Sequence, residues 1–172
     1  MRALIPVLLC CALIGAFAPA VAAGHRGGDA ADRGGAAAGV PALSWPLDPP
    51  PAPVRPFEPP EHAYGPGHRG VDLAGASGQP VLAAADGVVV FAGRLADREL
   101  VSLEHTGGLR TSYEPVHPLV ETGQRVSRGQ PIGRLQPGHC PEPCLHWGAR
   151  VDDAYVDPLG LLGGGRVRLL PW

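Results

Sequence analysis

Glycine and proline interrupt this chain too often for long helices. Its 172 residues include 25 glycines and 21 prolines, and both residues are unfavourable inside helices. Between them lie short apolar runs rich in β-branched side chains, which is the pattern of strands. Six runs are predicted strands: 81–85, 87–92, 100–104, 109–114, 131–135 and 145–151. The fold class is therefore mostly β, in a compact antiparallel arrangement.

Two short segments between these runs carry turn signals. Ala-Asp-Gly stands at 85–87, and Thr-Gly-Gly stands at 106–108. Such sequences suit the backbone angles of tight turns between antiparallel strands. We therefore predict a hairpin at each place.

The N-terminal 23 residues have the features of a secretory signal peptide. Arg2 precedes an apolar run over 3–17, and small residues follow up to Ala23. The alternative is a membrane anchor, but the run is short for a bilayer span. Cys10 and Cys11 do not directly follow a small residue, so a lipid anchor is not expected. We predict export, cleavage near Ala22 or Ala23, and no membrane span in the mature protein.

Composition divides the rest of the chain into three parts. Residues 24–42 are rich in glycine and alanine, and we predict a disordered spacer. Residues 43–162 form the predicted domain, which begins with a proline-rich strap over 43–60 and is followed by a flexible tail at 163–172. Trp45, Val54 and Phe57 are costly to leave in water, so the strap is expected to lie against the domain.

The charged residues exclude two classes of function. All fourteen cationic residues are arginines, the net charge is −2, and no basic stripe points to nucleic acid. The segments 87–90 and 126–133 look like hairpins of biotinyl and lipoyl carrier domains. Such a carrier attaches its cofactor to a lysine, and the chain has none.

A histidine and a carboxylate lie four residues apart in a glycine-rich segment. His68 precedes Asp72 in Gly-Pro-Gly-His-Arg-Gly-Val-Asp-Leu-Ala. If this segment enters a strand, the period of two sends Val71 and Leu73 to the core. Asp72 then points to the opposite face, beside the loop that carries His68.

A second histidine lies far along the chain in a strand of the same kind. In Cys-Leu-His-Trp, alternation sends Leu145 and Trp147 inward and leaves Cys144 and His146 on the site face. Two imidazoles and one carboxylate can thus meet.

Three such ligands leave a zinc ion one position for water, which is typical of a catalytic site. Each residue also has an ordinary alternative. His68 is equally suited to a loop, Asp72 to a turn, and His146 to a hydrogen-bonded strand position.

The motifs, in order, resemble the lysostaphin/LytM zinc endopeptidases over about 45–162. The matching segments are Gly-His-Arg-Gly-Val-Asp-Leu at 67–73, Ala-Asp-Gly-Val-Val-Val-Phe-Ala-Gly at 85–93, Gly-Gln-Arg-Val at 123–126, Gly-Gln-Pro-Ile-Gly at 129–133 and Leu-His-Trp-Gly-Ala-Arg at 145–150. The resemblance implies a duplicated hybrid motif fold with an antiparallel β groove. It also implies one Zn²⁺ held by His68, Asp72 and His146, and hydrolysis of peptidoglycan peptides at the cell wall.

Two positions depart from the family pattern. Members usually carry a histidine where this chain has Cys144, and another where it has Glu114. Losing an acid or base group typically costs about 10²–10⁴ in rate. The alternative function is therefore a weak or inactive module that binds cell wall or regulates another wall hydrolase. Glu114 is a candidate general base, with a solvated strand glutamate as its ordinary alternative.

Cys144 has three possible roles: zinc ligand, redox-active thiol, or disulfide partner of Cys140. Three residues separate the two cysteines, and export favours a disulfide.

Tyr113 and Arg150 are the candidates for the substrate groove. Arg150 shares a strand face with His146, and its alternative is surface pairing with Asp152 or Asp153. Of the other histidines, we place only His139 near the groove, and His105 is expected to be structural. We expect a monomer.

Overall fold

The computed structural model describes residues 39–62 and 65–163. The predicted signal peptide, most of the predicted spacer and most of the tail lie outside the described residues. Within the described ranges, no helix has the length and apolarity needed to cross a bilayer. The only helical turns in this part of the chain are two 3-10 segments, η1 (Thr106–Gly108) and η2 (Pro158–Leu161).

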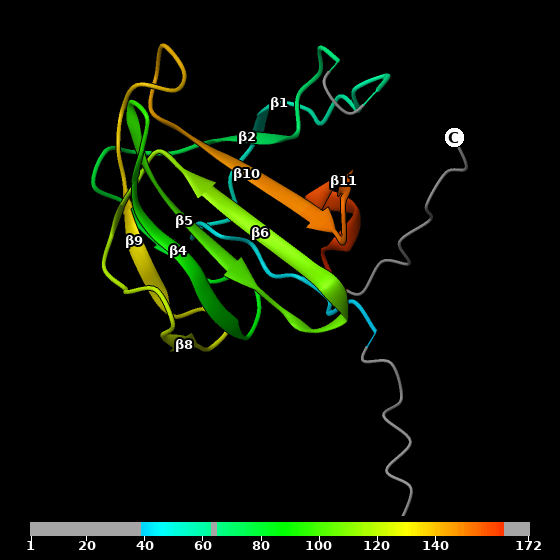
Figure 1. Cartoon of the computed structure of the whole chain (residues 1–172). Coiled ribbons are helices and arrows are strands. Elements are labelled where there is room, and N and C mark those ends of the chain that lie inside the picture. Colours follow the sequence, from blue (N-terminus) through cyan, green and yellow to red (C-terminus); the bar gives the residue numbers. More distant parts are fainter. Residues whose placement is uncertain (1–38, 63–64, 164–172) are drawn as a thin grey trace, which may run out of the picture. The chain divides into compact units, whose positions relative to one another are not determined.

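The larger of two sheets has eight antiparallel strands (Figure 1). Its order is β1-β2-β10-β6-β5-β4-β8, and β11 pairs with β10 outside this path. The strands are β1 (Pro53–Arg55), β2 (Gly70–Ala74), β4 (Gly87–Leu95), β5 (Arg98–Glu104), β6 (Leu109–Glu114), β8 (Arg125–Val126), β10 (Cys144–Val151) and β11 (Ala154–Val156). β2 and β10 are therefore direct neighbours, although about seventy residues separate them in the sequence.

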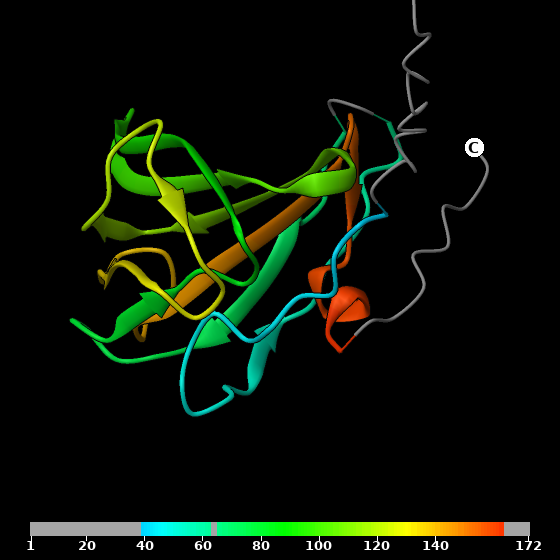
Figure 2. The ribbon, with the colours of Figure 1, turned by 90° about the horizontal axis from the view of Figure 1, so that it is seen from below.

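The smaller sheet has three antiparallel strands in the order β3-β9-β7. They are β3 (Pro80–Leu82), β7 (Val116–Pro118) and β9 (Pro131–Leu135). Figure 2 shows the ribbon with both sheets from below. Buried side chains from both sheets, including Ile132 of β9 and Leu103 of β5, belong to one hydrophobic cluster. That cluster is the core, and the mostly antiparallel fold class is confirmed.

The long strands follow the apolar runs of the sequence. Five of the six predicted strands are present over nearly their full length, as β4, β5, β6, β9 and β10. Alternation places the side chains as predicted: Val71 and Leu73 of β2, and Leu145 and Trp147 of β10, are all 0% exposed. The short strands β1, β7, β8 and β11 were not anticipated.

The predicted hairpin at 85–87 is wrong, whereas the one at 106–108 is confirmed. β5 and β6 pair on either side of η1. By contrast, β3 pairs with β9 and not with β4, so the segment after Leu82 crosses from the smaller sheet to the larger. Ala83 exchanges backbone hydrogen bonds with Gly129 and Gln130 instead of continuing the strand.

The strap lies against the domain over only part of its length. Leu43 and Leu47 are 2% and 1% exposed, and Trp45 packs against the core. Val54, however, is 56% exposed. It belongs to β1, which pairs with β2 at the edge of the sheet, so the expected burial of this side chain is wrong.

His105 has the structural role that the sequence predicts. It is 6% exposed, and its Nδ1 donates to the carbonyl of Asp86 at 2.8 Å. Its Nε2 lies 2.8 Å from Oγ1 of Thr111. Burial lowers the pKa of His105 from 6.5, although the hydrogen bond to Asp86 acts in the opposite direction.

This lowered pKa predicts a loss of stability in acid. Unfolding lets His105 take up a proton near pH 6.5, so its contribution is present above pH 6.5 and is lost as the pH falls below it. The His105→Gln variant should show a shallower decline, by at most about 1.4 kcal/mol per pH unit. Urea unfolding at pH 7.5 and 5.5 measures this. His117→Gln, at an exposed histidine, is the control, and equal declines in the wild type and His105→Gln would contradict the prediction.

Candidate functional site

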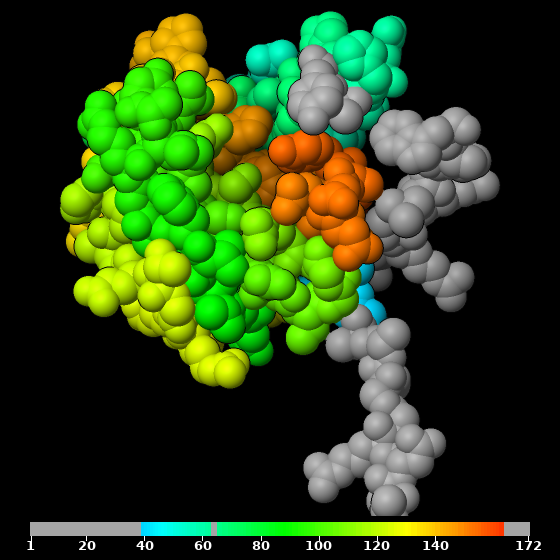
Figure 3. Space-filling view, in the orientation of Figure 1, coloured from blue at the N-terminus to red at the C-terminus, as the bar shows by residue number. Residues whose placement is uncertain are grey.

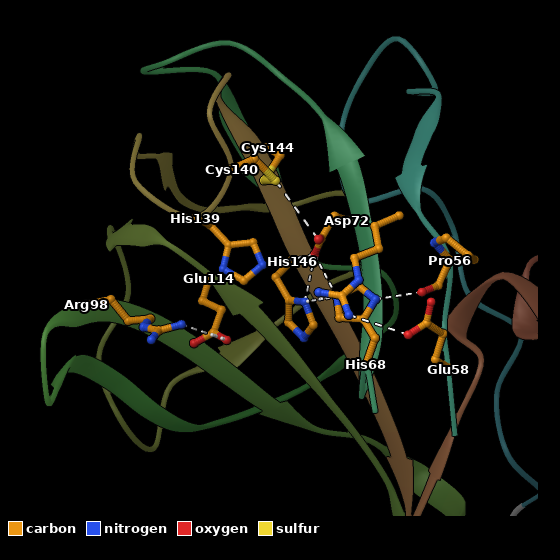
Figure 4. Close-up of polar contacts among 11 residues, drawn as sticks. Pro56, Glu58, His68, Asp72, Arg98, Glu114, His139, Cys140, Cys144 and His146 are labelled. Carbon is orange, nitrogen blue, oxygen red and sulfur yellow. Dashed lines mark hydrogen bonds and ion pairs between the residues drawn. A yellow bond between two sulfur atoms is a disulfide. The ribbon is translucent and has the colours of Figure 1, made fainter. Parts of the chain in front are cut away.

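The three predicted ligands converge at the start of β10 (Figure 4). His146 of β10 lies directly opposite Asp72 of β2 in the strand register. Nδ1 of His146 is 2.8 Å from Oδ1 of Asp72, and Nε2 of His68 is 3.0 Å from the same oxygen. The two histidine nitrogens lie 3.0 Å apart. The predicted meeting of two imidazoles and one carboxylate is therefore present in the structure.

The strap fixes the orientation of His68. Nδ1 of His68 lies 2.6 Å from the carbonyl oxygen of Pro56, which can only accept a hydrogen bond. The proton of the neutral ring therefore sits on Nδ1, and the lone pair of Nε2 faces Asp72. Backbone hydrogen bonds in both directions between His68 and Glu58 hold the loop against the strap. A carbonyl partner of this kind is typical behind a metal-binding histidine.

This arrangement needs a positive charge at its centre. With the His68 proton on Nδ1, lone pairs of Nε2 and of Asp72 Oδ1 face each other at 3.0 Å. Only an additional proton or a cation between these atoms relieves the repulsion. Ligands at 2.0–2.2 Å around tetrahedral zinc lie roughly 3.3 Å apart. The observed separations are a few tenths of an ångström shorter, so the cluster can hold such an ion with little movement.

Burial and neighbouring charges act in opposite directions on the pKa of Asp72, which is 3% exposed. Burial alone raises the pKa of a carboxyl group. The hydrogen bond from His146 and the charges of His139, His146 and His68 oppose this, and together they hold the pKa of Asp72 below its usual value. Burial lowers the pKa of His146, despite its hydrogen bond to Asp72. The carboxylate is thus ionised and the His146 imidazole tends to be neutral, which are the forms that bind metals.

Two glycines of the sequence motif leave room for the site. A Cβ atom on Gly70 would lie 2.7 Å from Nε2 of His146 and 2.6 Å from the carbonyl oxygen of Trp147. A Cβ atom on Gly67 would lie 2.8 Å from the carbonyl oxygen of Glu58. The glycines therefore allow the His68 loop to pack closely between the strap and β10.

His139 is a fourth member of the cluster. Its Nε2 lies 3.1 Å from Oδ1 of Asp72, and its ring centroid is 5.1 Å from that of His146. The donor atoms of His68, Asp72, His139 and His146 all lie within 4.8 Å of one another. Sequence reasoning placed His139 near the groove but gave it no role. Its position beside a cysteine was the only available signal.

The predicted disulfide is present. Cys140 and Cys144 are bonded, with an S–S distance of 2.03 Å and a Cα–Cα distance of 5.8 Å. The bond leaves neither sulfur as a thiolate, so the readings of Cys144 as a metal ligand or a redox-active free thiol do not apply to this state.

Glu114 and Tyr113 lie on opposite faces of β6. Glu114 is cross-strand to His146, and its carboxylate is 3.8 Å from Arg98. Tyr113 is 0% exposed, so its expected place in the substrate groove is wrong. Alternation along the strand explains this, because a site-facing Glu114 sends its neighbour to the core. There, the Tyr113 hydroxyl accepts a hydrogen bond from the backbone N–H of Ala84 at 3.1 Å.

Arg150 borders a hollow of about 150 Å³ on the outer face of the larger sheet. The hollow is also lined by Ser102, Arg110, Ser112, Gly148 and Tyr155. In the space-filling view, the orange atoms of β10 and β11 lie beside the light green atoms of β6 (Figure 3). Nε of Arg150 is buried and has no hydrogen-bond partner among the described residues. Neither Asp152 nor Asp153 forms an ion pair with Arg150 in this part of the chain.

Known proteins are similar to this chain in sequence and in structure. A protein of Mycobacterium tuberculosis described as uncharacterised is 51% identical over 172 residues, which cover 96% of this chain and 62% of that protein. This chain therefore spans less than two thirds of that relative's length.

Two solved peptidase structures share the fold. A zinc-containing peptidase from Vibrio cholerae matches with a TM-score of 0.60 and 29% identity, over 69% of this chain and 39% of that one. The catalytic domain of lysostaphin from Staphylococcus simulans matches with a TM-score of 0.55 and 28% identity, over 63% of this chain and 90% of that domain.

A family model supports the resemblance seen in the sequence motifs. The model described as peptidase family M23 matches residues 66–158, which is more than half of the chain. The matched range includes His68, Asp72, His139 and His146. The chain belongs to peptidase family M23.

Proposed function

We propose that this protein is a zinc-dependent endopeptidase that hydrolyses peptide bonds of bacterial peptidoglycan. The observation that carries the proposal is the convergence of His68 Nε2, His146 Nδ1 and Asp72 Oδ1 within 3.0 Å of one another. M23 peptidases act on peptidoglycan, and a fold neighbour at 29% identity is a zinc-containing peptidase. Membership of the M23 family and the set of two imidazole nitrogens and one carboxylate oxygen thus both support zinc.

His68, Asp72 and His146 would hold the ion. A bound zinc ion lowers the pKa of water and polarises a peptide carbonyl. The protein's own part is to keep the donors in place. The Pro56 carbonyl fixes the proton of His68 on Nδ1, and burial of Asp72 shields its charge from solvent.

The outer face of the larger sheet would bind the peptide. Gly148 lies between His146 and Arg150 on the same face of β10 and has no side chain to fill the surface. Arg150 is directly opposite Arg110 in the register. Arg110 forms an ion pair with Glu104 at 3.8 Å. Nε of Arg150, by contrast, is buried without a hydrogen-bond partner among the described residues, and an anionic group of the substrate would supply one.

Export to the cell wall follows from the same proposal. Residues 1–23 would act as the signal peptide and 24–42 as a spacer, ahead of a metallopeptidase domain at 43–162. Leu43 and Leu162 are bridged near the two ends of this range, which supports its C-terminal limit. Val40 already packs against the core, so the domain begins a few residues inside the proposed spacer.

The alternative function is that of a module that binds wall peptide, or regulates another hydrolase, without cleaving peptide bonds itself. Cys144 and Glu114 support it, because the family usually carries histidines at both positions. The Glu114 carboxylate also faces Arg98. An ion pair of this kind makes a carboxylate a weaker base. An unchanged cleavage rate in Glu114→Gln would leave this residue without a base role.

The metal proposal predicts that His146→Ala and Asp72→Asn lose zinc and hydrolysis together, because each removes one of three donors. Zinc content of the purified protein and release of soluble peptides from purified peptidoglycan measure the two effects. A chelator should stop the release, and added zinc should restore it. His117→Ala, which removes an exposed histidine bound to Glu99, is the matched control.

The two proposed functions give different results in this assay. Wild-type protein that holds one zinc ion per chain but releases no peptides would support the binding module. Wild-type protein that cleaves peptidoglycan without metal would refute the zinc site itself.

Gly70→Ala should weaken zinc binding by roughly 10–100-fold, the usual effect of disturbing the surroundings of a ligand. The added methyl group would collide with Nε2 of His146 and displace the ring from Asp72. Competition with a chromophoric chelator measures the affinity. Gly160→Ala is the control, because a Cβ atom there meets nothing within 4 Å. Unchanged affinity in Gly70→Ala would show that His146 does not bind the ion in this orientation.

Arg150→Ala should raise KM for peptidoglycan peptides about tenfold and leave kcat nearly unchanged. The arginine would bind a part of the substrate away from the reacting bond, and one charge-assisted hydrogen bond accounts for a change of that size. Steady-state kinetics on isolated wall peptides measure both constants. Arg125→Ala on the edge strand β8 is the control, and an unchanged KM in Arg150→Ala would argue for a purely structural arginine.

A further inference from the structure

A third imidazole lies on the solvent side of the proposed metal cluster. Nε2 of His139 is 3.1 Å from Oδ1 of Asp72. The His139 side chain is 20% exposed, against 12% for His146 and 4% for Asp72. Of these groups it is therefore the one most accessible to incoming water or substrate (Figure 4).

The backbone beside His139 is fixed to both strands that carry the site. Cys140, the next residue, is bonded to Cys144 at the start of β10. The carbonyl of Pro143 accepts a hydrogen bond from the N–H of Gly75, just after β2, at 3.1 Å. These two links tie the loop to the ends of β10 and β2. The position of His139 relative to Asp72 and His146 is thus set by the fold.

The disulfide is well suited to placing this loop. Its cysteines are only four positions apart in sequence. A bridge across so short a loop restricts the unfolded chain much less than a bridge across a long one. Its main effect is therefore local, on the residues next to it, and His139 is the neighbour that contacts the cluster.

The attacking water needs a hydrogen-bond partner from the protein, and two described residues are available. Glu114 is near His146, but the ion pair that its carboxylate makes is with Arg98 at 3.8 Å. His139 is already within hydrogen-bond distance of a proposed ligand oxygen. Three donors fill three zinc positions and leave one for water. Nε2 of His139 is the imidazole nitrogen beside Asp72 that belongs to none of the three proposed ligands.

We propose that His139 is a catalytic residue whose Nε2 hydrogen-bonds to the water that attacks the peptide carbonyl, and that the Cys140–Cys144 disulfide holds it there. This inference rests on the proposed function. When His68, Asp72 and His146 hold a cation, Oδ1 of Asp72 would be one of its ligands. Nε2 of His139 is then available to the water. The protein thereby obtains from a loop the imidazole that β10 lacks at position 144.

The test compares four variants of the full chain: His139→Ala, His139→Gln, the Cys140→Ser/Cys144→Ser double variant, and the triple variant with His139→Ala. His139→Ala should lower kcat on peptidoglycan by about 10²-fold or more, with zinc affinity within threefold of the wild type. His139→Gln should recover part of the rate, because its amide still hydrogen-bonds. The double variant should lower kcat by a similar factor to His139→Ala. The triple variant should have a kcat no lower than that of His139→Ala.

Glu142→Ala is the matched control, because Glu142 is an exposed residue of the same loop. The visible spectrum of the cobalt(II)-loaded protein gives a readout that needs no turnover. His139→Ala should change that spectrum at unchanged metal content, and Glu142→Ala should not. A wild type that holds metal but cleaves nothing would refute the proposed function, while the cobalt spectrum would still test His139.

Two results would overturn the assignment of His139. A loss of zinc affinity of about 100-fold in His139→Ala would make this residue a ligand. A wild-type kcat and cobalt spectrum in His139→Ala would leave it without a role at the metal. Wild-type rates in the disulfide variant would refute the part assigned to the bridge.

Discussion

One carboxylate oxygen organises the centre of this protein. Oδ1 of Asp72 lies within 3.1 Å of nitrogens from His68, His139 and His146, which come from three separate parts of the chain. A buried carboxylate is costly unless positive or hydrogen-bonding groups surround it. The pairing of β2 with β10, the glycine-rich loop and the disulfide all bring such groups to it. The surrounding fold can be understood as the means of meeting that requirement.

The parts of the fold that were predictable are those with a long periodic signal. Alternation along β6 and β10 identifies the strands and the faces of Leu145 and Trp147. Strands of two or three residues, such as β8 and β1, are too short to show a period, and their pairing depends on partners distant in sequence. The turn at 85–87 misled for the same reason, because its sequence is compatible with a hairpin but tertiary contacts of Ala83 decide its path.

The candidate site divides in the same way. His68, Asp72 and His146 lie on regular strands or directly beside one, so spacing and motif were enough to bring them together. His139 lies in a loop next to the Cys140–Cys144 disulfide. A loop has no regular alternation of side chains, so the sequence does not predict the direction of the His139 side chain. Tyr113 and Glu114 are neighbours in β6, so alternation can place only one of them on the face of His146. The pairing of Glu114 with His146 decides which one, and this long-range register is not written in the local sequence.

The hydrogen bond between His68 and the Pro56 carbonyl gives the strap a chemical task besides covering the domain. The segment that matches the family begins at residue 66, ten residues after this carbonyl. A version of the protein trimmed to that boundary would retain every proposed ligand. It would also free the imidazole of His68 to exchange its proton between the two ring nitrogens. The smallest unit of this M23-family domain that keeps the His68 hydrogen bond therefore begins upstream of the matched segment, in the proline-rich segment.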